Sequence, residues 1–122
     1  MKYDPLQPVD AEAWGALDEQ AKIACVKDYH RRHHIRLPNQ QVHALIHVIV
    51  ENQIAIGDSF PARATQERLI REGLDRHEAV HALGTVLAGE MFHVMKEKRP
   101  SNPLDYEEKL NELTASAWKK MV

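Results

Sequence analysis

The chain has 122 residues, of which 43% are hydrophobic and 28% are charged, and its net charge is −2 with histidine counted as neutral. This composition is ordinary for one soluble globular domain, and the lack of a basic surplus argues against nucleic acid as a partner. Cys25 is the only cysteine, which excludes an internal disulfide, and no apolar run has the length of a signal peptide or membrane span, so we expect a cytoplasmic protein.

Apolar residues recur at helical spacing, which predicts an all-α fold, a bundle of four to five helices in a single domain, residues 1–122. Residues 1–9 contain two prolines and are predicted to be an extended N-terminal segment. Asp10 is placed to cap a first helix that continues to about His30. The buried face of this helix is expected to contain Trp14, Leu17, Ala21, Ala24, Cys25 and Tyr29.

Asn39 is placed to cap a second helix that ends at Gly57. Its apolar face is expected to contain Val42, Leu45, Ile46, Ile49 and Ile56. Pro61 suits the first turn of a third, shorter helix, which is predicted to run to about Glu72 and to stop at Gly73.

Asp75 is expected to cap a fourth helix, and Glu78 follows it at capping-box spacing. This helix should run to about Lys98, because Pro100 cannot continue it. Asn102 precedes a proline and opens a fifth helix. The inward face of the fifth helix is predicted to contain Tyr106, Leu110, Leu113, Ala117 and Met121.

Histidine is the unusual feature of the composition, with eight copies. On the second predicted helix, His43, His47 and Glu51 follow one another at intervals of four residues. They span about 80° of the helix surface, at the edge of the apolar face. This is a position from which polar side chains can face a neighbouring helix.

The fourth predicted helix contains the sequence H-E-x-x-H, in which His77 and His81 are one turn apart on the same face. Two histidines at this spacing can bind one metal ion. In enzymes that have this motif the glutamate, here Glu78, is a general base acting on metal-activated water. The alternative is that Glu78 only caps its helix.

If the third helix is a simple return, the second and fourth helices run parallel and their first two turns lie at the same level. The predicted metal ligands are His43, His47, Glu51, His77 and His81. Zinc is the favoured ion, with iron or manganese as alternatives, because imidazole and carboxylate suit several first-row metals. Two further interpretations stay open, namely a buried, hydrogen-bonded histidine pair and an ion pair between Glu51 and Arg76.

A basic segment, His30–Arg36, follows the first predicted helix. Positive charge at the C-terminal end of a helix interacts favourably with the helix dipole, and we favour this interpretation. The alternative is a binding site for an anion or phosphate.

The central block resembles a group of short bacterial proteins of unknown function. The shared pattern is H-x3-H-x3-E-x-Q, here starting at His43 and ending at Gln53, followed by a helix with a histidine, an acid and a second histidine, here His77 to His81. This resemblance implies a helical fold and a metal, without an established activity.

The H-E-x-x-H motif is also similar to that of the zincin metalloproteases, and Gly84 matches the longer metzincin pattern. That pattern has a histidine where this chain has Leu87, so a further ligand would come from His47 or Glu51. The resemblance implies a zinc-dependent hydrolase.

The pairs His47 and Glu51, and His77 and His81, resemble the ligand pairs of hemerythrin-like bundles. Such bundles also use a histidine of the first helix, for which His30 is the candidate. They use a histidine of the last helix as well, and none is present here.

We therefore expect a metal-binding helical bundle with hydrolase-like chemistry, in which Glu78 moves protons. One alternative is a di-iron or di-manganese redox or oxygen-binding bundle. Another is a non-catalytic interaction module with a structural metal or histidine cluster. The expected partner is a small-molecule or peptide substrate, with a homodimer as a further option and neither nucleic acid nor membrane as a partner.

Overall fold

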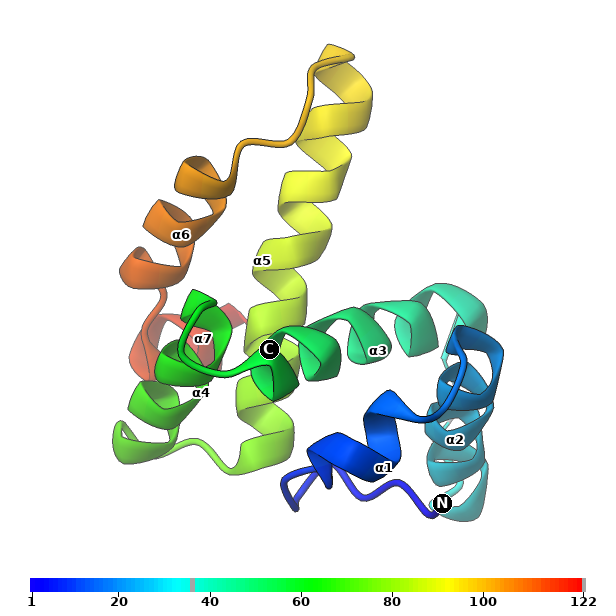
Figure 1. Ribbon diagram of the computed structural model, residues 1–122. Coiled ribbons are helices and arrows are strands. Elements are labelled where there is room, and N and C mark those ends of the chain that lie inside the picture. The colour runs from blue at the N-terminus through cyan, green and yellow to red at the C-terminus, as the bar shows by residue number, and fades with distance from the viewer. Residues whose placement is uncertain (36, 122) are drawn as a thin grey trace.

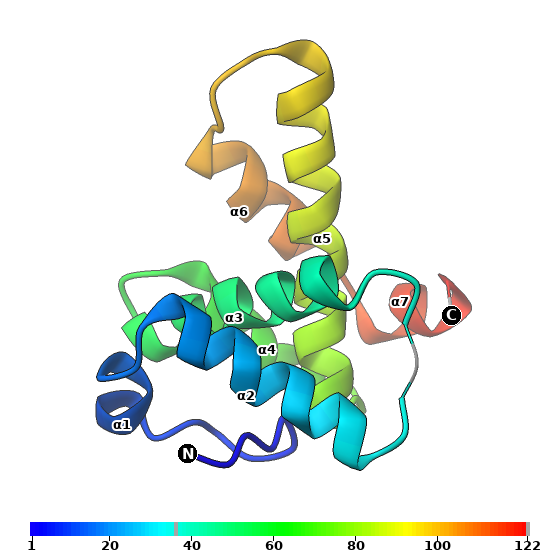
Figure 2. The same ribbon diagram turned by 90° about the vertical axis from the view of Figure 1, so that its right-hand side faces the viewer.

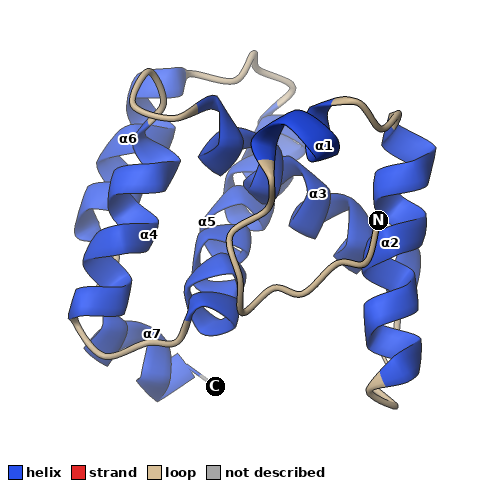
Figure 3. Ribbon diagram, turned by 60° about the horizontal axis from the view of Figure 1, so that its bottom comes forward, coloured by secondary structure: helices blue, strands red, loops and turns tan. Residues whose placement is uncertain are grey.

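The computed structural model describes residues 1–35 and 37–121, and all of their regular secondary structure is helical (Figure 3). The prediction of an all-α protein is therefore confirmed, but the described residues form seven helices rather than four or five. The helices are α1 (Ala11–Gly15), α2 (Glu19–Arg32), α3 (Gln40–Ile56), α4 (Pro61–Arg71), α5 (Arg76–Glu97), α6 (Pro103–Glu112) and α7 (Ala115–Met121).

The two additional helices arise because the first and last predicted helices are each interrupted. Asp10 caps α1 as predicted, but α1 is short, and the carboxylate of Asp18 accepts a hydrogen bond from the Ala21 N–H to start α2. At the other end of the chain, the Thr114 hydroxyl accepts from the Ala117 N–H and starts α7. Each interruption thus has its own side-chain cap.

The predicted boundaries of the three central helices are confirmed. Asn39 caps α3, which ends at Gly57 with φ +90°, and Gly73 follows α4 with φ +113°. Asp75 and Glu78 form a complete capping box at the start of α5.

Helix α3 lies at the centre of the molecule. It packs against α1 and α2 on one side and against α4 and α5 on the other, while α6 lies beside the C-terminal part of α5 (Figures 1 and 2). Helix α3 crosses α5 instead of running parallel to it, which corrects the expectation from helix order. The crossing is close, because a Cβ atom on Gly84 would lie 2.9 Å from the Ile46 Cγ2.

The buried face of α3 also differs from the predicted one. Val42 and Ile56 are 48% and 61% exposed, so they do not belong to the core. The buried residues are Ala44, His47, Val48, Val50, Glu51 and Ile54. Because α3 is covered on two sides, His47 and Glu51 lie inside the protein rather than at the edge of an apolar stripe.

The described helices include none with the length and apolar character needed to cross a membrane.

Candidate metal centre

Four histidines from three helices converge in the interior of the protein. His30 comes from α2, His47 from α3, and both His77 and His81 from the first two turns of α5. Each contributes one ring nitrogen to a group in which all four nitrogens lie within 4.8 Å of one another. We call these four residues the histidine cluster. It brings together enough imidazoles, at close enough range, to hold a metal ion.

The ring nitrogens of the cluster face each other directly. The His81 Nε2 lies 2.9 Å from the His47 Nε2 and 3.0 Å from the His77 Nε2. His77 and His81 meet because residues four apart lie on one face of a helix. His47 reaches them because the crossing of α3 over α5 is close. The sequence prediction that His47, His77 and His81 share one place is therefore confirmed.

Tyr3 fixes the orientation of the His47 ring. The Tyr3 hydroxyl donates to the Glu51 Oε2 at 2.6 Å, and it lies 3.1 Å from the His47 Nδ1. Since the single hydroxyl proton is given to the carboxylate, the His47 Nδ1–H is the donor to the tyrosine oxygen. Neutral His47 then carries a lone pair on Nε2, the nitrogen that faces His81. A carboxylate relay behind a histidine is a common support for metal ligands.

Glu51 is held by Arg76 instead of joining the cluster. The guanidinium makes two hydrogen bonds to the Glu51 carboxylate, at 2.7 and 2.9 Å, and a third to the Pro5 carbonyl at 2.9 Å. Burial opposes the charge of Arg76, but the contact with Glu51 outweighs it and raises the arginine pKa. The ion pair between Glu51 and Arg76, which the sequence analysis left as an alternative, is present. Glu51 was predicted as a metal ligand, but it is not part of the histidine cluster and instead contacts His47 through Tyr3.

His30 completes the cluster. It was not in the main set of predicted ligands and was named only as the first-helix histidine that the hemerythrin resemblance would use. Its side chain is 4% exposed, and its Nδ1–H donates to the Val26 carbonyl at 2.8 Å. The Nε2 atom is then a lone-pair acceptor, and it is buried without a hydrogen-bond partner among the described residues. Such an orphaned nitrogen is expected where an ion binds. A usable sequence signal was the spacing of His30 from Val26 and Ile23, which places it on the buried face of α2.

His43, a predicted ligand, lies beside the cluster but outside the group of four. Its ring centroid is 4.8 Å from those of His30 and His47 and 5.1 Å from that of His81. The His43 Nε2 is buried and has no hydrogen-bond partner among the described residues. His43 is thus available for contact with whatever occupies the adjacent space.

The predicted catalytic residue Glu78 is directed to the start of its own helix. Its carboxylate accepts from the Asp75 N–H at 3.0 Å, while the Glu78 N–H donates to the Asp75 carboxylate at 2.7 Å. The capping interpretation is therefore confirmed. A role for Glu78 as a general base stays a prediction.

Burial favours the uncharged form of His43, His47, His77 and His81. Desolvation, followed by repulsion from neighbouring imidazoles, lowers the pKa of His81 to about 3 and that of His43 to about 4. The pKa values of His47 and His77 are lowered mainly by burial as well. Neutral imidazole is the form that binds metal ions.

The spacing of the nitrogens also suits an ion. Metal–nitrogen bonds of about 2.0–2.1 Å place the ligand atoms of a tetrahedral site roughly 3.4 Å apart. The distances between ligand nitrogens in the structure run from 2.9 Å at His81 to at most 4.8 Å across the group, and this range includes the tetrahedral value. Small rotations of side chains would therefore be sufficient to form the site.

The basic segment does not extend the cluster beyond His30. Arg31 and Arg32 both pair with Asp28, and His33 and His34 are exposed. Arg36, the last residue of the segment, lies outside the described residues. The charges therefore stand at the C-terminal end of α2, as the helix-dipole interpretation predicts.

One protein family matches the chain over residues 13–112, and it is described as a domain of unknown function (DUF1841). The match includes all four residues of the histidine cluster. The description assigns neither a metal nor an activity. No curated protein and no solved structure matches the chain.

Proposed function

We propose that this chain, which belongs to the DUF1841 family, is a metal-binding protein whose metal centre is the histidine cluster. The observation that carries the proposal is the convergence of four buried or half-buried ring nitrogens within 4.8 Å. The hydrogen bonds of His30 and His47 support it, because each uses the Nδ1 proton and leaves Nε2 as a lone pair. Imidazoles held in this way are prepared to bind an ion without losing a proton.

Zinc is the first candidate for the ion. It prefers four ligands in a tetrahedral arrangement and accepts imidazole nitrogen readily. Copper, nickel and iron also accept imidazole, whereas manganese prefers oxygen ligands, so a site made of nitrogen atoms favours manganese least. The di-iron alternative has little support, because Glu51 is engaged by Arg76 and Glu78 caps its own helix.

We propose further that the ion takes a fifth, exchangeable ligand in addition to the four imidazoles. His47 and His81 both line a cavity, which supports access for a small molecule. A bound ion would supply Lewis-acid chemistry there, as in metal-dependent hydrolases. The chain's own part is to orient His47 through Tyr3 and Glu51, and His30 through the Val26 carbonyl.

A structural role is the second candidate. The ligands come from α2, α3 and α5, so an ion would link three helices, of which α3 and α5 are also joined by the Glu51–Arg76 pair. Removal of the ion by a chelator would then lower the unfolding temperature, as it does in structural zinc sites.

Elemental analysis of tag-free protein after reconstitution with zinc tests the proposal. We expect one equivalent of zinc in the wild type and a loss of stoichiometric binding in His47→Ala and His77→Ala, which remove ligands from two helices. Exposed His93 of α5 provides the matched control, and His93→Ala should retain the ion. The absence of bound zinc, copper, nickel and iron in the wild type after reconstitution would overturn the proposal.

A further inference from the structure

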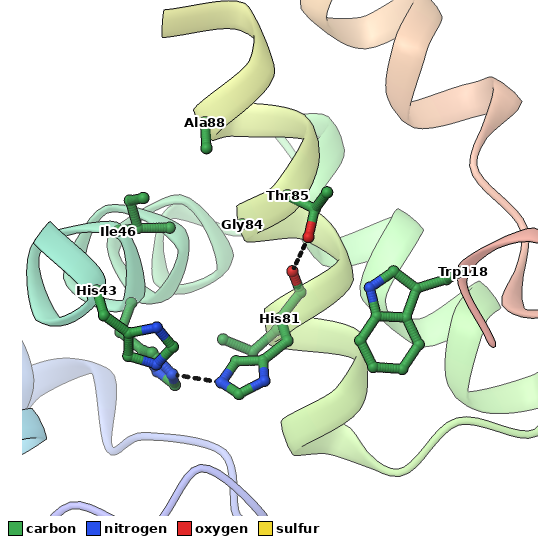
Figure 4. A pocket seen from close by; sticks show the side chains of 9 residues that line it. His43, Ile46, His81, Gly84, Thr85, Ala88 and Trp118 are labelled. Atoms are coloured by element: carbon green, nitrogen blue, oxygen red, sulfur yellow. Dashed lines mark hydrogen bonds between the residues drawn. The ribbon is translucent and has the colours of Figure 1, made fainter. Parts of the chain in front are cut away.

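A cavity of about 280 Å³ adjoins the histidine cluster between α3, α5 and α7. Figure 4 shows His43 and His81 reaching toward the same space from α3 and α5, with Trp118 of α7 on the far side of His81. His47 is part of the same wall. The cavity therefore leads to two of the four candidate ligands.

Apart from the imidazoles and Thr85, the residues that line the cavity are apolar or small. Ile46, Val80 and Trp118 contribute large apolar side chains to the lining, and Gly84 and Ala88 leave space because their side chains are small. The volume of about 280 Å³ is slightly below the usual range for sites that bind drug-sized molecules. An occupant would therefore be a small molecule with a short apolar part.

Charge determines the other part of the occupant. Four neutral imidazoles add no negative charge to offset the two positive charges of a divalent ion at this largely buried place. The Glu51 carboxylate cannot balance them, because it is already neutralised by the Arg76 guanidinium. A buried charge without a partner is costly, so an anion from the cavity would be favoured as an additional ligand.

His43 provides a hydrogen-bond donor for such an anion. Neutral His43 has one N–H, which no partner among the described residues fixes at its buried Nε2. Its ring lines the cavity, so a small rotation of the ring would turn this N–H toward an anion there. The ring stands 5.1 Å from the His81 ring, centroid to centroid, on the side of the cluster that faces the cavity. A carboxylate has two oxygens, one for the ion and one for this N–H.

We propose that the cavity binds a small monocarboxylate, which contacts the metal ion through one oxygen, accepts a hydrogen bond from His43 through the other, and places a short alkyl group against Ile46, Val80 and Trp118. This inference rests on the proposed metal centre. It assigns His43 as a ligand-binding residue rather than as a metal ligand.

Cobalt(II) in place of zinc gives a direct test, because its visible absorption changes with its ligands. The cobalt-loaded protein is titrated with propionate, and with propionamide as the uncharged molecule of matched shape. We expect saturable changes with propionate and none with propionamide. His43→Phe keeps a ring but removes the N–H, and it should retain cobalt while weakening propionate roughly 10- to 100-fold, the loss expected for a hydrogen bond to a charged group.

Ala88→Leu is a second variant that narrows the cavity without touching the cluster, and it should also retain cobalt and weaken propionate binding. Stoichiometric cobalt whose spectrum does not respond to propionate would overturn this inference and leave the metal centre intact. Unchanged propionate affinity in both variants would overturn it as well. Failure of the wild type to bind cobalt or zinc would instead overturn the proposed function itself.

Discussion

The Nε2 atoms of His47 and His81 lie 2.9 Å apart, although they belong to different helices and are 34 residues apart in the chain. The His47 Nε2 carries a lone pair, because the single proton of the neutral ring is on Nδ1, which donates a hydrogen bond to the Tyr3 oxygen. The contact is then attractive only with a proton on the His81 Nε2 or with a cation between the rings. The Nε2 of His77, 3.0 Å from the same atom of His81, must share that single proton. An ion satisfies all three nitrogens at once.

The Tyr3 hydroxyl should matter for metal affinity. Tyr3→Phe removes the link between Glu51 and His47, so the imidazole loses its fixed orientation while the ring packing remains. We expect the dissociation constant for zinc to rise about 10- to 100-fold, the usual effect of losing a group that supports a ligand. Competition with a chelating dye measures it. Tyr29→Phe is the control, since Tyr29 packs against His77 without a hydroxyl hydrogen bond to the cluster, and an equal effect there would contradict the relay.

The buried pair of Arg76 and Glu51 should be important for stability. Their side chains are 5% and 0% exposed, and Arg76→Met would leave the Glu51 carboxylate buried without its charged partner. Loss of one partner of a buried ion pair costs about 3–5 kcal/mol in the free energy of unfolding. Urea denaturation measures the loss. The exposed pair of Arg31 and Asp28 offers the comparison, and Arg31→Met should change the free energy of unfolding far less.

Acid should destabilise the metal-free protein before its carboxylates titrate. In the folded state the pKa of His43 is about 4 and that of His81 about 3, whereas an unfolded histidine has a pKa of about 6.5. Below pH 6.5 the unfolded chain therefore binds more protons than the folded one, and stability falls with pH toward 4. Urea midpoints between pH 7 and 5 check the slope. His81→Gln should flatten it and His93→Gln should not; a flat profile in the wild type would refute the prediction.

Two glycines of α5 should respond to alanine in opposite directions. At Gly84 a new Cβ would lie 2.9 Å from the Ile46 Cγ2, so Gly84→Ala must push α3 and α5 apart or move the isoleucine. We expect a loss of about 1–3 kcal/mol, the range typical of overpacking. Gly89 has no atom within 4 Å of the same position, and Gly89→Ala should gain about 0.5–1 kcal/mol from helix propensity. Thermal unfolding of both variants measures the contrast, and equal shifts would argue against a close crossing.

The sequence was sufficient for most of the helix boundaries because the caps act locally. Asn39 and Asp75 satisfy N–H groups only two or three residues away, and Gly57 and Gly73 have the positive φ that favours glycine. The break at Asp18 has the same local origin and was missed, because the apolar spacing continues across it. The spacing of apolar residues can be read from the sequence more easily than a break in a helix that leaves this spacing unchanged.

The histidine cluster was predictable only in part. His77 and His81 share a helix face whatever the fold, and helical spacing likewise places His47 among the polar residues of its own helix. The participation of His30 depends on how α2 packs against α3, and the exclusion of Glu51 depends on the position of Arg76. These are tertiary relationships, and the assumption of parallel helices gave a different arrangement from the observed crossing.

The most direct test of the account compares His30→Ala with His33→Ala. Both histidines lie at the end of the same helical region and both use Nδ1 to bond a carbonyl one turn earlier, but only His30 belongs to the histidine cluster. Zinc binding is measured by isothermal titration on the metal-free proteins. The account predicts one equivalent of tightly bound zinc in His33→Ala and strongly weakened binding in His30→Ala. Equal affinity in the two variants would contradict a centre that includes α2.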